Sequence, residues 1–344
     1  MTIVFRVDSS SRIGDGHVMR SIELAIKMKK KNVIFFSSKL GLKHKKILKK
    51  NKIKLISEFN IPDTKNHFLE WSIFRQKKDF NFLQKKLRGQ KIKQIIIDHY
   101  GLSYFWEKQA KTIAKKVIVI DDLANKEHYC DFYINYHNHF KKNKINQLMV
   151  NKNTKLLLGD RFCLVGNIIS SVKKTNFKNK ISIYFGSVDK KNITFEVCKI
   201  IKNNIFKPFR FNIIIGKKNS NRLRIKDFIK KSRNIVCKEA NIDNFSNYYK
   251  NIDNVISASG VTMYEQLSYG FKPIVIPQNE NQKKIAKSLF KNELINLMDL
   301  KSIKNKKLLY KILFRNKNFY EKSSVNKILE NIRNGLKNTV NQLK

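Results

Sequence analysis

Residues 3–28 read IVFRVDSSSRIGDGHVMRSIELAIKM. The apolar start, 3–8, predicts a buried strand, and the Ser- and Gly-rich stretch after it predicts a loop that ends near His17. Beyond the loop, apolar residues recur at helical spacing, at Val18, Ile22, Ala25 and Met28. A strand, a short polar loop and an amphipathic helix form the first part of a βαβ unit, so this stretch indicates an α/β fold with a parallel sheet.

The same alternation continues along the chain. Several runs, such as Ile95-Ile96-Ile97 and Ile213-Ile214-Ile215, are continuously apolar, which is typical of parallel strands buried on both faces. Strands are expected at 3–8, 32–38, 94–98, 116–120, 132–135, 155–158, 181–186, 210–215, 254–258 and 273–277.

The length of 344 residues favours two domains rather than one. A polar, lysine-rich segment near 166–180 separates two halves that both alternate strands with helices. We therefore expect two Rossmann-like α/β domains. The expected ranges are 1–168 for the first domain, 176–305 for the second and 306–344 for a polar helical tail.

The charge of the chain is extreme: Lys and Arg total 72, Asp and Glu total 26, and the net charge is +46. Such a surplus is typical of a polyanion-binding protein, which is one functional hypothesis. Lysine and asparagine are spread over the whole sequence, however, and no basic arm, zinc-finger spacing or aromatic RNA-binding motif stands apart. We therefore favour a general compositional bias and expect no specific nucleic-acid partner.

Targeting signals and paired cysteines are absent from the sequence pattern. The four cysteines, Cys130, Cys163, Cys198 and Cys237, form no CxxC pair, so we expect small buried hydrophobes in a reducing compartment. No apolar run has the length of a signal peptide core or a membrane span. The sequence predicts a cytoplasmic protein without membrane insertion, and it leaves the oligomeric state open.

The loop that ends at His17 is the first candidate site. Open α/β sheets place ligands above the carboxyl ends of their strands, where this loop is expected. Gly14 and Gly16 would let the backbone approach a ligand closely, and Arg12 is a further substrate-binding candidate. A neutral His17 could accept a proton from water, although a tight turn without a catalytic role fits the motif alone slightly better.

Two strand-to-helix turns in the second half form the second candidate site. Their backbone amides and hydroxyls could hold phosphate oxygens, while Glu265 could accept hydrogen bonds from ribose hydroxyls. The alternatives are an ordinary turn with Asp189 as a helix cap, and a solvated or dipole-paired Glu265. The candidates are Gly186, Ser187, Asp189, Ser259, Gly260, Thr262, Glu265, Asn281 and Gln282.

Four motifs occur in order within residues 1–290. They are Asp8-Ser9-Ser10-Ser11 with Ile13-Gly14-Asp15-Gly16-His17, then Ile97-Asp98-His99-Tyr100-Gly101, Ile120-Asp121-Asp122, and Ser257-Ala258-Ser259-Gly260 with Tyr264-Glu265. Together they resemble the UDP-sugar hydrolases of pseudaminic acid biosynthesis, which act on UDP-2,4-diacetamido-2,4,6-trideoxy-β-L-altropyranose. The resemblance implies two Rossmann-like domains facing a cleft, the glycosyltransferase-B type, similar to the N-acetylglucosaminyltransferase that makes lipid II.

The resemblance also implies an activity and its residues. Water would attack C1 of the sugar with His17 as the base, releasing UDP, and no cofactor would be needed. Asp98 and Tyr100 would lie in the active site, while the turns of the second half would bind the uridine and the diphosphate. Two of those turns, Gly186-Ser187-Val188-Asp189 and Ala258-Ser259-Gly260-Val261, depart from the family pattern, and both departures lie on the nucleotide side.

A glycosyltransferase of the same fold is the second enzyme hypothesis. A transferase with a lipid-linked acceptor would carry an exposed apolar patch on its first domain, whereas 40–54 is lysine-rich. The residues 121–122 and the pair His137 and His139 resemble metal ligands only superficially, so we expect no metal. The two aspartates are expected to cap the segment after their strand, and His99 is expected to be a satisfied structural histidine.

Overall fold

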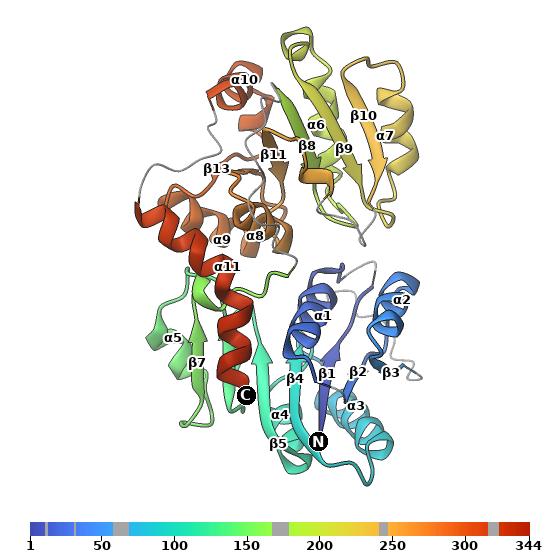
Figure 1. Cartoon of the computed structure of the whole chain (residues 1–344), viewed down its shortest axis with the longest axis vertical. Coiled ribbons are helices and arrows are strands. Elements are labelled where there is room, and N and C mark those ends of the chain that lie inside the picture. Colours follow the sequence, from blue (N-terminus) through green and yellow to red (C-terminus); the bar gives the residue numbers. More distant parts are fainter. Residues whose placement is uncertain (11–12, 31, 58–68, 167–178, 241–246, 316–322) are drawn as a thin grey trace. The chain divides into compact units, whose positions relative to one another are not determined.

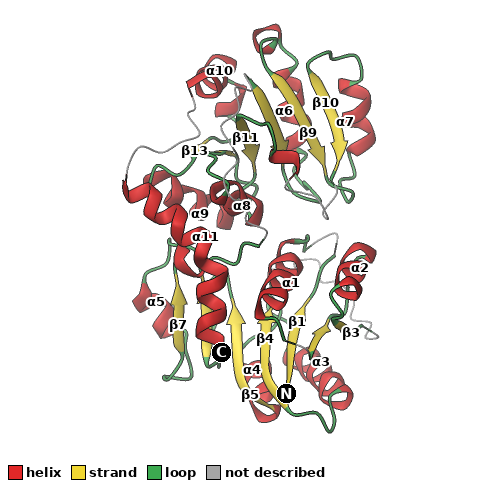
Figure 2. Ribbon diagram, in the orientation of Figure 1, coloured by secondary structure: helices red, strands yellow, loops and turns green. Residues whose placement is uncertain are grey.

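The computed structural model describes residues 1–10, 13–30, 32–57, 69–166, 179–240, 247–315 and 323–344. The chain divides into two compact units, one of Met1–Gly166 with Asn334–Lys344 and the other of Asn167–Arg333. Each unit contains one parallel sheet with helices packed beside it (Figure 1, Figure 2).

The first unit is built on a seven-stranded sheet in the order β3-β2-β1-β4-β5-β6-β7, and every neighbouring pair is parallel. Its strands are β1 (Thr2–Val7), β2 (Val33–Phe36), β3 (Lys54–Ile56), β4 (Ile92–Asp98), β5 (Ala114–Ile120), β6 (Phe132–Asn135) and β7 (Lys155–Leu158). Its helices are α1 (Gly16–Met28), α2 (Leu42–Lys50), α3 (Ile73–Lys86), α4 (Tyr104–Ile113) and α5 (Lys142–Gln147), with the 3₁₀ turn η1 (Asp160–Phe162).

Both faces of this sheet are buried, as its continuous apolar strands require. On one face Ile95 and Ile97 pack with Phe80 of α3 and Trp106 of α4. On the other face Ile96 is also fully buried. The β-branched and aromatic strand residues therefore fill two layers of core rather than one.

The second unit is built on a six-stranded parallel sheet in the order β10-β9-β8-β11-β12-β13. Its strands are β8 (Lys180–Tyr184), β9 (Arg210–Ile215), β10 (Ile235–Glu239), β11 (Asn254–Ser257), β12 (Ile274–Val275) and β13 (Asn296–Leu297). Its helices are α6 (Ile193–Ile201), α7 (Arg222–Ile229), α8 (Val261–Ser268), α9 (Glu280–Lys291) and α10 (Lys306–Arg315), with the 3₁₀ turns η2 (Asn204–Phe206) and η4 (Ser302–Lys304).

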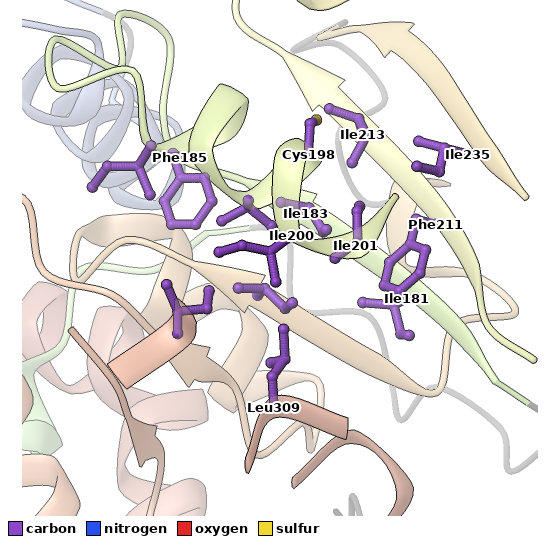
Figure 3. Packing of buried hydrophobic residues seen from close by; sticks show 14 of the residues in the cluster. Ile181, Ile183, Phe185, Cys198, Ile200, Ile201, Phe211, Ile213, Ile235 and Leu309 are labelled. Atoms are coloured by element: carbon purple, nitrogen blue, oxygen red, sulfur yellow. The ribbon is translucent and has the colours of Figure 1, made fainter. Parts of the chain in front are cut away.

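The core of the second unit lies between the strands and the helices α6, α7 and α10. Figure 3 shows Ile183 of β8 near Ile200 of α6, and Leu309 of α10 belongs to the same cluster. Residues 306–315, which the sequence assigns to a polar tail, thus also contribute apolar side chains to this core.

The last helix, α11 (Ser323–Leu343), brings the chain end back to the first unit. The hydroxyl of Thr339 donates to the carbonyl of Phe162 at 3.2 Å. A Cβ at Gly335 would lie 2.5 Å from backbone atoms of Cys163, so only glycine allows this approach. The predicted domain boundary near 166–180 falls mostly on residues outside those that the structure describes.

The predicted fold class of two parallel α/β domains is confirmed. All ten expected strands are present, whereas β3, β10 and β13 were not predicted. Three of the four cysteines are buried, and Cys237 is partly buried. In the part of the chain that the structure describes, no helix combines the length and the apolar character needed to cross a membrane.

Candidate active site

The loop after β1 positions His17 at the start of α1. Gly14 has a φ of +83°, which a residue with a side chain rarely adopts, and its amide donates to the carbonyl of Ser10 at 2.9 Å. The Ser9 hydroxyl donates to the carbonyl of Gly14 and to the Asp15 carboxylate, both at 2.9 Å. Helix α1 then begins at Gly16, so His17 is its second residue. Arg12 lies outside the described residues.

Asp98 is the last residue of β4, and its carboxylate meets the imidazole of His17. The distance from His17 Nδ1 to Asp98 Oδ1 is 2.5 Å. Because a carboxylate only accepts, this hydrogen bond assigns the proton of the neutral ring to Nδ1. The other nitrogen, Nε2, has no hydrogen-bond partner among the described residues. The pair therefore presents an acceptor nitrogen that is free to take a proton.

Arg20 lies one turn further along α1 and joins the carboxylate of Asp98 to that of Asp122. Its Nε and Nη2 donate to the two oxygens of Asp98 at 2.7 and 2.6 Å. Its Nη1 donates to Asp122 at 2.8 and 2.9 Å, and to the hydroxyl of Tyr136 at 2.8 Å. The guanidinium is 1% exposed, so these are hydrogen bonds between desolvated charges.

The charges of this network decide the protonation of its carboxylates. Burial disfavours an ionised Asp98, but Arg20 and His17 outweigh burial and hold the pKa of Asp98 below its usual range. Burial acts in the same way on Asp122, where Arg20 and His137 outweigh it and the pKa lies well below the usual range. Both carboxylates are thus anions at neutral pH, and each can orient a donor.

Tyr100 completes the surroundings of the imidazole. Its ring meets that of His17 edge-on, with the ring centroids 4.6 Å apart, and its hydroxyl donates to Asp122 at 3.2 Å. Burial, followed by the charge of Asp122, raises the pKa of Tyr100 well above its usual value, so the phenol stays a neutral donor. The structure therefore brings the predicted residues His17, Asp98 and Tyr100 together.

Three partners in this network were not predicted as site residues. They are Arg20, Tyr136 and Asp122. Of these, Asp122 had been expected to cap the segment after its strand. Arg20 follows His17 by three positions on one helix, a spacing that places both side chains on one face and was a usable signal. His137, considered as a metal ligand, instead places Nε2 3.1 Å from Asp122. Among the described residues no cluster of three or more His, Cys, Asp or Glu side chains could hold a metal ion.

His99, which follows Asp98 in the chain, is held at both of its ring nitrogens. His99 accepts from the Gly101 amide at Nδ1, at 3.0 Å, and its Nε2 lies 3.1 Å from Asp8. Asp8 also accepts both Nη nitrogens of Arg6, at 2.7 and 3.1 Å. Burial, followed by the positive charge of Arg6, lowers the pKa of His99, so its ring is neutral and both nitrogens are occupied.

His128 belongs to a separate buried cluster. Its Nδ1 contacts Glu107 at 2.7 Å, and its Nε2 lies 3.5 Å from Asp121, which is an ion-pair contact longer than a good hydrogen bond. Burial opposes protonation of His128, but Glu107 and then Asp121 outweigh it and raise its pKa to about 9. Asp121 also accepts from the amides of Leu123 and Ala124, as the expected cap after β5.

The turn after β8 contains the first group of candidates in the second unit. Gly186 has a φ of +92°. A Cβ at Gly216, the residue after β9, would lie 2.3 Å from the carbonyl oxygen of Ser187, so a second glycine allows the turn to pack here. Asp189 accepts from the amides of Ile193 and Thr194, both at 2.9 Å. Its carboxylate thus has the geometry of a cap for α6.

The start of α8 holds the second group. Ser259 is 1% exposed, and its hydroxyl has no hydrogen-bond partner among the described residues. Gly260 is the N-cap of α8 and provides no side chain to cap its amides. Thr262 and Glu265 are partly buried. A helix start with uncapped amides beside an unsatisfied hydroxyl is a favourable place for an anion.

The first turn of α9 is held by its own side chains. Asn279 accepts from the Gln282 amide at 2.9 Å, and the Gln282 side chain accepts from the Gln278 amide at 2.8 Å. Gln278 in turn donates to the carbonyl of Phe185 at 2.7 Å, which ties this turn to the end of β8. Asn281 is partly buried.

Both sets of candidates lie at topological switch points. In the first sheet the chain order reverses between β1 and β4, whose ends carry the His17 loop and Asp98. In the second sheet it reverses between β8 and β11, whose ends carry the turns at Gly186 and Ser259. Ligands of open α/β sheets bind at such points, because the loops diverge there.

Comparison with known proteins gives weak sequence similarity. No family model matches the chain. It is 28% identical over 300 residues to the uncharacterized protein MJ1062 of Methanocaldococcus jannaschii, covering 82% of this chain and 57% of that protein. It is 27% identical over 238 residues to the UDP-2,4-diacetamido-2,4,6-trideoxy-beta-L-altropyranose hydrolase of Campylobacter jejuni, covering 68% and 77% of the two chains. The chain thus spans little more than half the length of the archaeal relative.

Solved structures are similar over almost the whole chain. MurG of Acinetobacter baumannii has a TM-score of 0.63 at 13% identity, covering 100% of this chain and 99% of its own. The structure of S. aureus MnaA with UDP has a TM-score of 0.60 at 10% identity, covering 97% and 91%. These identities establish the fold alone, and the chain has the two-domain glycosyltransferase-B fold.

Proposed function

We propose that this protein hydrolyses a UDP-sugar to UDP and the free sugar, with His17 as the general base. The observation that carries the proposal is the pair of His17 and Asp98 at the switch point of the first sheet. Asp98 fixes the Nδ1–H tautomer, so the free Nε2 has the lone pair that a base requires.

The reaction follows from that free nitrogen. Nε2 removes a proton from water as the water oxygen forms a bond to C1 of the sugar. The bond from C1 to the diphosphate oxygen breaks, and its electron pair leaves with UDP. Because UDP is a good leaving group, one base suffices and the paired carboxylates of ordinary glycosidases are not needed. Attack from the face opposite UDP inverts the anomeric centre, and the imidazolium then releases its proton to solvent.

The nucleotide is assigned to the second domain, 176–305, and the base to the first, 1–168. The uncapped start of α8 and the unsatisfied Ser259 hydroxyl offer donors for the diphosphate. Glu265, one turn into α8, offers acceptors for the ribose hydroxyls. UDP is present in the MnaA structure, and the Campylobacter relative is a hydrolase of a UDP-sugar, which supports this class of substrate.

The sugar that we propose is 2,4-diacetamido-2,4,6-trideoxy-β-L-altropyranose, as in the name of the Campylobacter relative. The test is to incubate the purified protein with this UDP-sugar and with a panel of others, and to follow UDP release and the anomeric proton by NMR. We expect UDP and the inverted free sugar. Release of UDP only when a sugar acceptor is added would favour a glycosyltransferase, and no release from any donor would refute both activities.

The variant that tests the base is His17→Asn. Turnover should fall about 10²–10⁴-fold, the usual contribution of a positioned general base, while UDP affinity changes little. His99→Asn is a matched control, because His99 follows Asp98 directly but both of its ring nitrogens are already bonded. A folded His17→Asn protein with turnover close to the wild type would exclude His17 as the base.

A further inference from the structure

Arg20 touches both members of the proposed catalytic pair. Two of its nitrogens donate to the two oxygens of Asp98, and the same Nη2 lies 3.1 Å from His17 Nδ1. Because the N–H at Nδ1 donates its hydrogen bond to Asp98, Nη2 of Arg20 and Nδ1 of His17 are both donors. Their separation of 3.1 Å is therefore a contact and not a hydrogen bond. A fixed positive charge therefore lies within 3.1 Å of Nδ1, beside the carboxylate oxygen that lies 2.5 Å from the same atom.

The two charges act on the imidazole in opposite directions. A lone carboxylate at Nδ1 favours the imidazolium form, which cannot accept a proton from water. An adjacent guanidinium disfavours that form. Tyr100, which follows β4, packs edge-on against the ring, and Asp122, which follows β5, interacts with the ring through its charge. Two groups that follow β6 contact these residues in turn: Tyr136 accepts from Arg20, and His137 lies beside Asp122. Asp122 thus adds a second negative charge, which Arg20 also binds.

We propose that Arg20 is a positioning residue that holds Asp98 against Nδ1 of His17 and places a positive charge beside the ring, which opposes the negative charge of the carboxylates. The fork of Nε and Nη2 fixes the plane of the carboxylate, and the bonds from Nη1 to Asp122 and Tyr136 fix the guanidinium. The role as a base depends on the proposed function, whereas the balance of charges exists in the free protein.

A second arginine of the same unit provides the matched control. Arg6 is fully buried and also joins two carboxylates, Asp8 and Asp79. None of its hydrogen bonds in the described part of the chain involves His17. Arg6→Gln should therefore reproduce the loss of a buried, doubly paired guanidinium without changing the charge next to the imidazole.

The experiment measures two quantities in the wild type, Arg20→Gln, Asp122→Asn and Arg6→Gln. One is the NMR titration midpoint of the His17 ring, assigned by its absence in His17→Asn, and the other is the acid limb of the pH profile of turnover. In Arg20→Gln both should move to higher pH, and turnover at neutral pH should fall about tenfold or more. In Asp122→Asn both should move to lower pH, and in Arg6→Gln neither should move.

Arg20→Lys separates charge from position. Lysine keeps the positive charge but cannot donate to both oxygens of Asp98 from one planar group. The titration midpoint of His17 should therefore stay near that of the wild type while turnover falls. Midpoints that do not move in Arg20→Gln, or that move the same way in Asp122→Asn, would overturn the proposal. If Arg20→Gln does not fold, the titration midpoints of Arg20→Lys and Asp122→Asn still test the proposal. If no UDP-sugar is hydrolysed, the proposed function fails, and the NMR titration alone tests Arg20.

Discussion

Replacing Asp98 by asparagine tests the orientation of the proposed base. The change keeps the size and shape of the side chain but removes the charge that accepts from His17 Nδ1 and from two nitrogens of Arg20. In the reaction that we propose, His17 becomes an imidazolium as water attacks. The carboxylate of Asp98 stabilises that charge, whereas an amide in the same place does not.

The size of the effect follows from the geometry. The contact of 2.5 Å between Nδ1 and Oδ1 places the centres of the two charges about 4 Å apart, where the interaction at an effective dielectric constant near 20 is about 4 kcal/mol. A loss of that size in transition-state stabilisation lowers turnover by about 10³-fold, since each 1.36 kcal/mol corresponds to about a factor of ten. The affinity for UDP should change little, because UDP is assigned to the second domain.

The assay follows UDP release by Asp98→Asn under saturating substrate, together with thermal unfolding and calorimetric binding of UDP. Asp79→Asn is the control, because Asp79 is a fully buried partner of Arg6 and accepts from Trp106 at 2.9 Å but does not touch His17. We expect a loss of stability in both variants and a large loss of turnover only in Asp98→Asn. Turnover of folded Asp98→Asn within tenfold of the wild type would refute the reasoning.

Two further predictions concern the nucleotide and the pH dependence of stability. Glu265→Ala should weaken UDP binding by about 1–3 kcal/mol by calorimetry, while the exposed control Glu280→Ala should not, and an unchanged affinity would remove Glu265 from the site. The pKa of His128, raised from 6.5 to about 9, adds stability that is fully present below pH 6.5 and is lost as pH rises through 9. The free energy of unfolding in urea should therefore fall by about 3 kcal/mol between pH 6 and pH 10, and a flat profile would contradict the assignment of a charged His128. Glu107→Gln, which removes the main partner of His128, should make that profile shallower.

The sequence predicted the central strands because they are continuous apolar runs with both faces buried. The three strands that it missed lie at or beside the edges of the sheets. In β3, Lys54–Ile56, one residue of three is buried, and in β10, Ile235–Glu239, one of five is buried. The strand β13 has two residues. These three strands are defined by hydrogen bonds to a neighbour rather than by burial, so hydrophobic patterning did not reveal them, whereas the edge strand β7, Lys155–Leu158, was predicted.

The candidate site was predictable where its residues follow strands and form motifs, as His17, Asp98 and Tyr100 do. In the network that surrounds them, the spacing of Arg20 from His17 was a signal, but the partners of Arg20 could not be predicted. Arg20 and Tyr136 are 116 positions apart, and they meet only because β1, β4, β5 and β6 are neighbours in the sheet. Arg6 lies inside a buried strand, and a buried charge needs a buried counter-charge. Its position in the sequence therefore predicts an acidic partner, although it does not identify that partner.

The electrostatics of the two switch points support assigning the diphosphate to the second domain. At and beneath the carboxyl edge of the first sheet, Arg6 is paired with Asp8 and Asp79, and Arg20 is paired with Asp98 and Asp122. An anion bound there would be repelled by these carboxylates, because the two arginines are already paired with them. At the second switch point the uncapped amides of α8 form the positive end of a helix, and the carboxylate of Asp189 is already bonded to α6. The same topology thus produces a site suited to a base in the first sheet and a site suited to a phosphate in the second.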